Sequence, residues 1–283
     1  MKRILVPTDF SDTALKALIY AAELATKSGG TVTLLHVITP DENRVWRPHA
    51  LDDDYEGMYI KKQQSKLDAI WNNMLHLYPD LTLLTELGKG LLPESIIDFS
   101  KSTNADLIIM GTTGASGFRQ LFMGSVTASM IGKTNIPVLA VPASYEMKEP
   151  QTILFATNHF EKEVQLIEPV INLARYFAAS IHLLVFVDTD DANPEDYIRQ
   201  GRKLESYVGS FREEYPEIQF NSLLLDGSSF ENRVEECIQE LGADLFVMIS
   251  YQKNFFERIT GKSMTKKMAY HSTIPLLSLS ARR

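Results

Sequence analysis

The amino-acid sequence repeats itself, and this repeat constrains the architecture more than any other feature. Five segments of the first half return in the same order in the second half, so the chain is a tandem duplication of one domain. The polar, proline-bounded segment PASYEMKEP (142–150) is the predicted linker between a first domain at 1–143 and a second at 150–283. The matched pairs are RILVPTDFSD (3–12) with TILFATNHFE (152–161), TVTLLHV (31–37) with IHLLVFV (181–187), LYPDL (77–81) with EYPEI (214–218), NADLIIMG (104–111) with GADLFVMI (242–249), and NIPVLAV (135–141) with TIPLLSL (273–279).

Each half alternates short apolar runs with longer amphipathic stretches, which is typical of α/β domains. Runs such as ILV and LIIM are apolar on both faces, so they predict a parallel sheet covered by helices on both sides. Right-handed crossovers then give two tandem, doubly wound α/β domains, each with a five-stranded parallel sheet. In the first half we expect strands at 3–7, 31–38, 81–88, 105–111 and 136–141, and helices at 11–30 (with Ser11 as its N-cap), 57–79, 93–104 and 125–135.

The composition argues against several classes of protein. The 283 residues carry a net charge of -8, and an acidic chain repels phosphate backbones, so nucleic acid is not an expected partner. The single cysteine, Cys237, leaves no disulfide within the chain, as in a reducing compartment. No apolar stretch approaches the roughly 18 residues of a membrane span, and the first residues do not resemble a signal peptide. We therefore expect a cytoplasmic protein without a membrane partner.

A carboxylate stands just after the first predicted strand. Pro7 ends that strand because it lacks an amide donor, and Asp9 then falls in the turn before the first helix. Ligands of doubly wound sheets bind beyond the carboxyl ends of the strands, where Asp9 lies. Two readings of Asp9 follow: a turn or capping carboxylate, or an acceptor for ribose hydroxyls or a cation.

A glycine-rich stretch follows the fourth predicted strand. Gly111 ends the strand, Gly114 comes three residues later, and Gly124 with Ser125 begins the next helix. Glycine lets main-chain amides approach a ligand, and a helix start presents unpaired amides and the positive end of its dipole. With the hydroxyls of Ser125 and Thr127 added, these features predict an anion site. The alternative is a surface loop in which Ser125 is an ordinary helix cap.

Other chemical motifs are missing or misplaced. GKT at 132–134 and GKS at 261–263 lack the upstream glycine of a P-loop, and no G-x-G-x-x-G follows the first strand. The histidines show no metal-ligand spacing, and no G-x-S-x-G is present. The acidic run LDDDYEG at 51–57 is expected to be a solvated loop. No catalytic residue and no metal ligand is predicted.

The spacing Gly111-x2-Gly114-x9-Gly124-Ser125 resembles the G-x2-G-x9-G-(S/T) signature of the ATP-binding branch of the universal stress proteins. The segments ILVPTDFSD and NIPVLAV resemble the first and last strands of that family. The resemblance covers the first half closely and the second half more weakly. It implies a sheet of order 3-2-1-4-5, dimerisation through the last strands, and a role in stress survival rather than efficient catalysis.

The resemblance also implies which residues would bind ATP. Asp9 and the main chain of Val37 would lie near adenine and ribose, with Met110 and Gly111 bordering the same pocket. AMP and ADP are alternative ligands, and Mg2+ would accompany ATP. The phosphates would lie at Gly114, Gly124, Ser125, Val126 and Thr127, and the flanking residues Pro7, Thr8 and Thr112 complete the predicted nucleotide-binding set.

The second half departs from this pattern. β-Branched Ile249 stands opposite Gly111, where it would disfavour a positive φ and fill the space that a phosphate needs. We therefore expect one nucleotide site per chain and a second domain with a structural role. The other replacements are Gly114 by Gln252, Gly124 by Lys262 and Asp9 by Asn158, while Ser125 keeps its type as Ser263.

Three functions are compatible with these observations. The first is an ATP-binding stress-response protein, the second a slow ATPase or other nucleotide-dependent enzyme, and the third an interaction module whose glycine stretch is a connection. The sequence argues against the enzyme, because it offers no general base beyond Asp9 and no carboxylate pair for a metal and a water. The apolar last strand of each domain needs cover, which predicts an intramolecular pseudo-dimer and leaves a homo-oligomer open.

Overall fold

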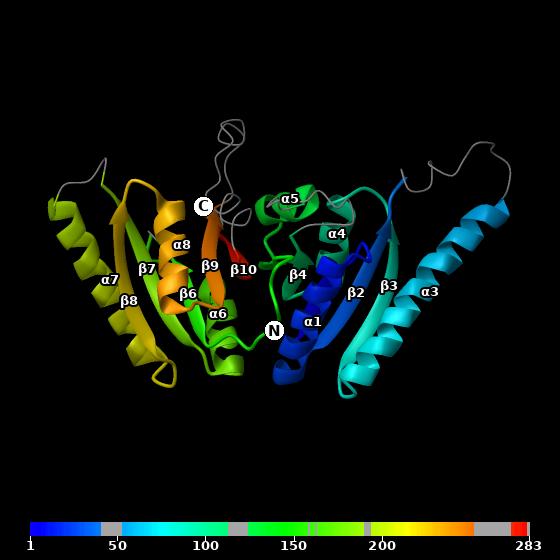
Figure 1. Ribbon diagram of the computed structural model, residues 1–283, viewed down its shortest axis with the longest axis horizontal. Helices are drawn as coiled ribbons and strands as arrows, with labels where there is room; N and C mark the ends of the chain where they lie inside the picture. Colours follow the sequence, from blue (N-terminus) through cyan, green and yellow to red (C-terminus); the bar gives the residue numbers. More distant parts are fainter. Residues whose placement is uncertain are drawn as a thin grey trace. The chain divides into compact units, whose positions relative to one another are not determined.

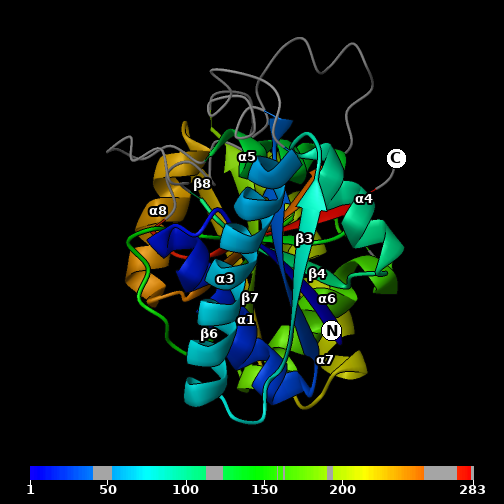
Figure 2. The same cartoon turned by 90° about the vertical axis from the view of Figure 1, so that its right-hand side faces the viewer.

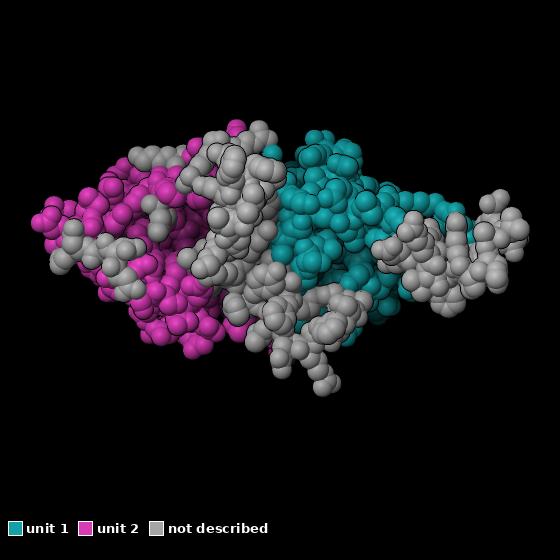
Figure 3. All heavy atoms as spheres, turned by 90° about the horizontal axis from the view of Figure 1, so that it is seen from above, with its two compact units in different colours: residues 1–143 teal, residues 144–283 magenta. Residues whose placement is uncertain are grey.

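The computed structural model describes residues 1–40, 53–112, 124–157, 159–161, 163–189, 194–251 and 273–281. The chain divides into two compact units, Met1–Ala143 and Ser144–Arg283, called unit 1 and unit 2 below (Figure 3). Within these residues, no helix combines the length and the hydropathy that crossing a bilayer requires.

Unit 1 is a parallel sheet with helices on both faces. Its strands lie in the order β3-β2-β1-β4-β5, as predicted, and α1 and α3 cover one face while α4 lies on the other (Figures 1 and 2). The elements are β1 (Arg3–Pro7), α1 (Asp12–Ser28), β2 (Thr31–Ile38), α3 (Asp53–Leu77), β3 (Thr82–Lys89), α4 (Glu94–Ser102), β4 (Leu107–Gly111), α5 (Ser125–Lys133) and β5 (Val138–Val141).

Unit 2 repeats the arrangement. Its strands lie in the order β8-β7-β6-β9-β10, all parallel, so two doubly wound α/β folds are confirmed. The elements are β6 (Thr152–Ala156), α6 (Val164–Phe177), β7 (Ser180–Asp188), α7 (Pro194–Glu214), β8 (Phe220–Gly227), α8 (Phe230–Leu241), β9 (Leu245–Tyr251) and β10 (Leu276–Ala281).

The strand register corrects one of the sequence matches. β1 pairs Arg3 with Thr31, and β6 pairs Thr152 with Ser180. The counterpart of Thr31 is therefore Ser180, and the match that began at Ile181 was wrong by one residue. Because side chains alternate along a strand, this shift by one residue decides which residues of β7 lie on the face of their sheet that corresponds to a given face of β2.

Helix α1 begins and ends as its sequence predicts. The Ser11 hydroxyl accepts a hydrogen bond from the Ala14 amide at 3.2 Å, and Gly29 ends the helix in the left-handed conformation at φ 61°. The face of the helix turned to the sheet is buried and includes Ala14, Ala17, Leu18, Ala21 and Ala22.

One aspartate ties the start of the fourth strand to the start of the first strand in each unit. Asp106 Oδ2 accepts hydrogen bonds from the Lys2 and Arg3 amides at 2.7 and 2.9 Å. In unit 2 the buried Asp244 accepts from the two amides at 151 and 152 at 2.8 and 3.0 Å. Partial burial would raise the pKa of Asp106, but the two amide donors and Arg3 outweigh it, so this pKa lies below its ordinary value.

Two polar segments have structure that the sequence did not specify. The acidic run at 51–57 was expected to be a loop, but α3 begins at Asp53, so most of this run is helical. Within the segment at 142–150, Tyr145 is buried and donates its hydroxyl to the Lys148 carbonyl at 3.1 Å. Lys148 in turn lies 2.5 Å from Asp244, so this polar stretch is held by side-chain contacts.

The outer strands β3 and β8 each have a carbonyl covered by the preceding helix. The indole nitrogen of Trp71 on α3 donates to the Leu83 carbonyl at 3.0 Å. The guanidinium of Arg212 on α7 donates twice to the Phe220 carbonyl, at 3.0 and 2.8 Å. Edge strands present unpaired main-chain groups, and these two side chains occupy part of that edge.

Candidate functional site

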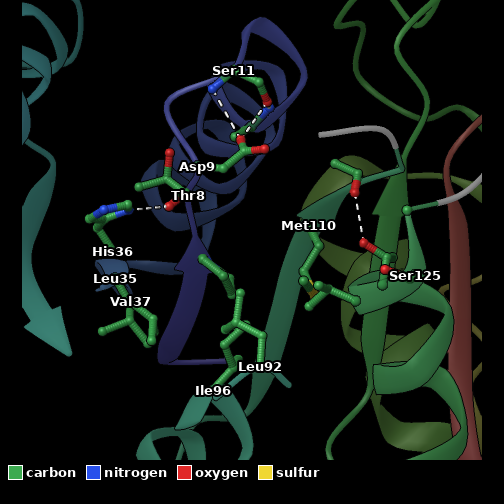
Figure 4. A pocket seen from close by; sticks show the side chains of 16 residues that line it. Thr8, Asp9, Ser11, Leu35, His36, Val37, Leu92, Ile96, Met110 and Ser125 are labelled. Carbon is green, nitrogen blue, oxygen red and sulfur yellow. Dashed lines mark hydrogen bonds between the residues drawn. The ribbon is translucent and has the colours of Figure 1, made fainter. Parts of the chain in front are cut away.

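A cavity of about 390 Å³ opens at the carboxyl ends of β1, β2 and β4, beside the start of α5 (Figure 4). This is where the winding of a doubly wound sheet reverses and where ligands of such sheets bind. Thr112 is not among its lining residues, and Gly114 lies outside the described residues. The predicted site residues that line it are Pro7, Thr8, Asp9, Val37, Met110, Gly111, Gly124, Ser125, Val126 and Thr127.

The turn after β1 is fixed by its own hydrogen bonds. The Thr8 amide donates to the Leu35 carbonyl at 2.8 Å, and His36 Nδ1 lies 2.9 Å from the Thr8 carbonyl, to which it donates (Figure 4). Asp9 Oδ1 accepts from the amide and the hydroxyl of Ser11, at 3.1 and 2.6 Å. Asp9 is therefore the turn carboxylate that one interpretation predicted, and it also lines the cavity.

His36 has the packing role of a strand-terminal histidine. It is buried, and its ring lies 4.3 Å from that of Phe10, centroid to centroid. Phe10 has a positive φ of 64°, which is uncommon for a bulky residue. The ring contact and the bond to Thr8 hold the turn in this conformation.

The start of α5 forms the polar end of the cavity. Its N-cap is Gly124, without a side-chain hydrogen bond, so the reading of Ser125 as an ordinary cap is wrong. The first amides of a helix have no partner within the helix and carry the positive end of its dipole. The Thr127 hydroxyl donates to the Gly111 carbonyl at 2.8 Å, so it joins α5 to β4 instead of offering its hydrogen to a ligand.

Gly111 is required for a reason that the sequence did not reveal. It is not among the described glycines with a positive φ. Instead, a Cβ at this position would lie 2.7 Å from Cγ2 of Thr13, and 2.9 and 3.0 Å from its main-chain carbon and oxygen. The absent side chain therefore lets the first turn of α1 lie against the end of β4.

The counterpart of this contact in unit 2 differs at both ends. Ile249 occupies the position of Gly111 on β9, and the loop before the helix runs from 157 to 163, against 8 to 11 in unit 1. Helix α6 begins at Val164, so it starts later after its strand than α1 does. Asn158 and the glycine replacements Gln252, Lys262 and Ser263 lie outside the described residues.

The opposite end of the cavity is apolar and includes residues that the sequence did not single out. Val37 and Leu35 come from β2, whereas Leu92 and Ile96 come from the start of α4 and the loop before it (Figure 4). One signal for the α4 residues was available: they follow the third strand, and the carboxyl ends of parallel strands meet at one edge. The cavity thus joins an apolar wall to a helix N-terminus across the Asp9 turn.

A model of the universal stress protein family matches residues 1–142, half of the chain. The chain belongs to this family. A universal stress protein of Methanocaldococcus jannaschii is 31% identical over 147 residues, which cover 50% of this chain and 81% of that protein.

Similarity to universal stress proteins also extends over both units. A universal stress protein of Mycolicibacterium smegmatis is 24% identical over 294 residues, covering 99% of this chain and 97% of that protein. The crystal structure of a universal stress protein from Archaeoglobus fulgidus has a TM-score of 0.70 at 17% identity and covers 98% of this chain and 96% of its own. At that identity the likeness concerns the fold, which is that of a tandem family member.

Proposed function

We propose that unit 1 binds an adenine nucleotide, with ATP and Mg2+ as the expected ligand, and that the protein acts in a stress response in the cytoplasm. The observation that carries the proposal is the cavity itself. It places an apolar wall, a carboxylate and a helix N-terminus around one space at the switch point of the sheet. A nucleoside phosphate has the complementary parts: an apolar base, a ribose with hydroxyl donors, and an anion.

The ribose end of the proposal rests on Asp9. A carboxylate only accepts hydrogen bonds, and ribose hydroxyls donate them. The bonds from Ser11 to Oδ1 hold the carboxylate in a fixed direction at the edge of the cavity. A pre-oriented acceptor of this kind binds a diol without ordering a mobile side chain, which favours affinity.

The phosphate end rests on α5. The uncapped amides after Gly124 favour an anion, and Ser125 adds a hydroxyl at the same end. Among the described residues that line the cavity, none is a lysine or an arginine. A divalent cation bound with a triphosphate would offset part of its charge, so we expect ATP to bind better with Mg2+ than without it. AMP and ADP, which carry less charge, are the alternative ligands.

We propose binding rather than efficient turnover. Asp9 is the one carboxylate among the described lining residues, and its Oδ1 already accepts two hydrogen bonds. The described part of the chain holds no group of three or more His, Cys, Asp or Glu side chains placed for a metal ion. Hydrolysis would need a general base and a positioned water, and Asp9 is the one candidate base among the described lining residues.

We further propose one nucleotide per chain, bound in unit 1, with unit 2 structural. The support is the sequence of unit 2, in which Ile249 stands in place of Gly111 and the other glycines of the signature are replaced by Gln252 and Lys262.

The test is titration calorimetry and thermal melting of the full chain with ATP, ADP and AMP, each with and without Mg2+. Ligand at one hundred times its dissociation constant should stabilise unit 1 by about 2.7 kcal/mol. Asp9→Ala should weaken binding at least tenfold, whereas Asp98→Ala, an exposed acid on α4 outside the cavity, should leave it unchanged. Absence of binding by all three nucleotides would rule out the proposal, and a stoichiometry of two would rule out the single site.

A further inference from the structure

Two residues of the cavity's apolar wall come from separate elements. Val37 lies on β2 and is 6% exposed, whereas Leu92 precedes α4 and is 36% exposed. Figure 4 shows both at the end of the cavity away from Asp9 and Ser11. A flat heteroaromatic base that enters this end would meet side chains from two sides.

The loop that carries Leu92 is held firmly. The Gly90 amide donates to the Ile38 carbonyl at 3.1 Å, and the Ser95 amide donates to the Leu91 carbonyl at 2.9 Å. Gly90 has a φ of 141°, which favours glycine, and a Cβ there would collide with the Ser95 hydroxyl. The loop is thus tied by a main-chain hydrogen bond to the end of β2, the strand that carries Val37.

Unit 2 carries larger side chains at both corresponding positions. The Thr8 amide donates to Leu35, and the Thr157 amide donates to Leu184, so Phe186 is the counterpart of Val37. Asp106 and Asp244 occupy equivalent places in the two units, because each ties the first strand to the fourth. Leu92 precedes Asp106 by the same number of residues as Phe230 precedes Asp244, so Phe230 is the counterpart of Leu92.

These two phenylalanines contact each other. The ring centroids of Phe186 and Phe230 are 5.4 Å apart and the planes meet at 85°. Edge-to-face pairs in direct contact have centroids about 4.5–7 Å apart, so no third ring fits between them. In unit 2 the side chains at the two corresponding positions are therefore packed directly against each other.

We infer that the size of the side chains at positions 37 and 92 determines whether a unit accepts a nucleotide base. The inference rests on the proposed function of unit 1 and adds the specificity-determining residues of that site. Val37 and Leu92 leave a slot that a purine fills, and the phenylalanines of unit 2 close the same slot. Leu92 is the new member of the site, because it was not among the residues expected from the sequence and it acts through its side chain.

The test uses Leu92→Phe in the full chain, with Leu91→Phe as its matched control. Leu91 is adjacent, 67% exposed and not part of the cavity lining, so its substitution adds the same ring outside the slot. Titration calorimetry with ATP and Mg2+, and with adenosine, should show at least a tenfold loss of affinity for Leu92→Phe and no more than a twofold change for Leu91→Phe. The double variant Val37→Phe/Leu92→Phe, which reproduces unit 2, should abolish adenosine binding.

Melting of each ligand-free variant establishes that it is folded, and Leu92→Phe alone decides the matter if the double variant does not fold. The inference is overturned if the wild-type chain binds adenosine or ATP and Leu92→Phe binds them equally well. It is also overturned if Leu91→Phe loses as much affinity as Leu92→Phe. A wild-type chain that binds no adenine ligand contradicts the proposed function itself, so the two failures are distinct.

Discussion

Replacement of Gly111 by alanine should destabilise unit 1 through α1, not through the loss of a ligand contact. The new Cβ would lie 2.7 Å from Cγ2 of Thr13 and 2.9 and 3.0 Å from its main-chain carbon and oxygen. Carbon atoms in contact are normally about 3.5–4.0 Å apart. The methyl group of Thr13 can rotate away, but its main chain can move only if the first turn of α1 shifts away from β4.

The magnitude follows from this geometry. Overpacking a well-filled site by one methyl group costs about 1–3 kcal/mol, and the upper part of the range applies where the main chain must move. For a domain of this size, each kcal/mol lowers the melting temperature by roughly 2–4 °C. The same shift would carry Asp9 and Ser11 out of place, so nucleotide affinity should fall together with stability.

Thermal melting and urea unfolding of the full chain test this reasoning, with Gly57→Ala as the control in the same unit. A Cβ at Gly57 of α3 meets nothing within 4 Å, so alanine there should be neutral or stabilise the helix by up to about 1 kcal/mol. Adding Thr13→Ala to Gly111→Ala should not restore stability, because main-chain atoms of Thr13 remain too close. Wild-type melting of Gly111→Ala, or full rescue by Thr13→Ala, would refute the explanation.

Three further changes give sharp expectations. Asp106→Asn should lower the free energy of unfolding by about 1 kcal/mol at pH 7. Because folding lowers the pKa of Asp106, the stabilisation by its carboxylate is complete above about pH 3.9 and is lost as the pH falls through the folded pKa. The urea midpoints of variant and wild type should therefore converge in acid. Thr127→Val should cost about 1–3 kcal/mol by leaving the Gly111 carbonyl without its donor, whereas Thr127→Ser should melt close to wild type. Trp71→Phe should uncover the Leu83 carbonyl on β3 and increase self-association in sedimentation experiments; unchanged sedimentation would contradict this role.

The sequence predicted the fold well because its signals are local and repeated. Strands apolar on both faces and helices with recognisable caps, such as Ser11 and Gly29 on α1, give the order of elements directly. The duplication then supplies the same pattern twice. The sequence alignment of β2 with β7 was wrong by one residue, because their runs of leucine and valine align almost equally well in either position.

The cavity was predicted in part. Residues next to strand ends, such as Asp9 and Met110, are found from strand positions and from the family signature. Leu92 was missed because its loop has no distinctive spacing, and its place in the wall depends on how α4 crosses the sheet. The reason for Gly111 was also missed, since close approach of a helix from a distant part of the chain leaves no mark on the local sequence.

The contact between Gly111 and Thr13 also bears on how duplicated domains drift apart. In unit 2 two features have changed together: isoleucine stands at 249, and α6 begins later than α1 does. In unit 1 the glycine and the early start of α1 depend on each other, because a Cβ at position 111 would lie 3.0 Å or less from main-chain atoms of Thr13. Reversion of Ile249 to glycine would therefore not by itself rebuild the arrangement of unit 1, because α6 would still begin at Val164.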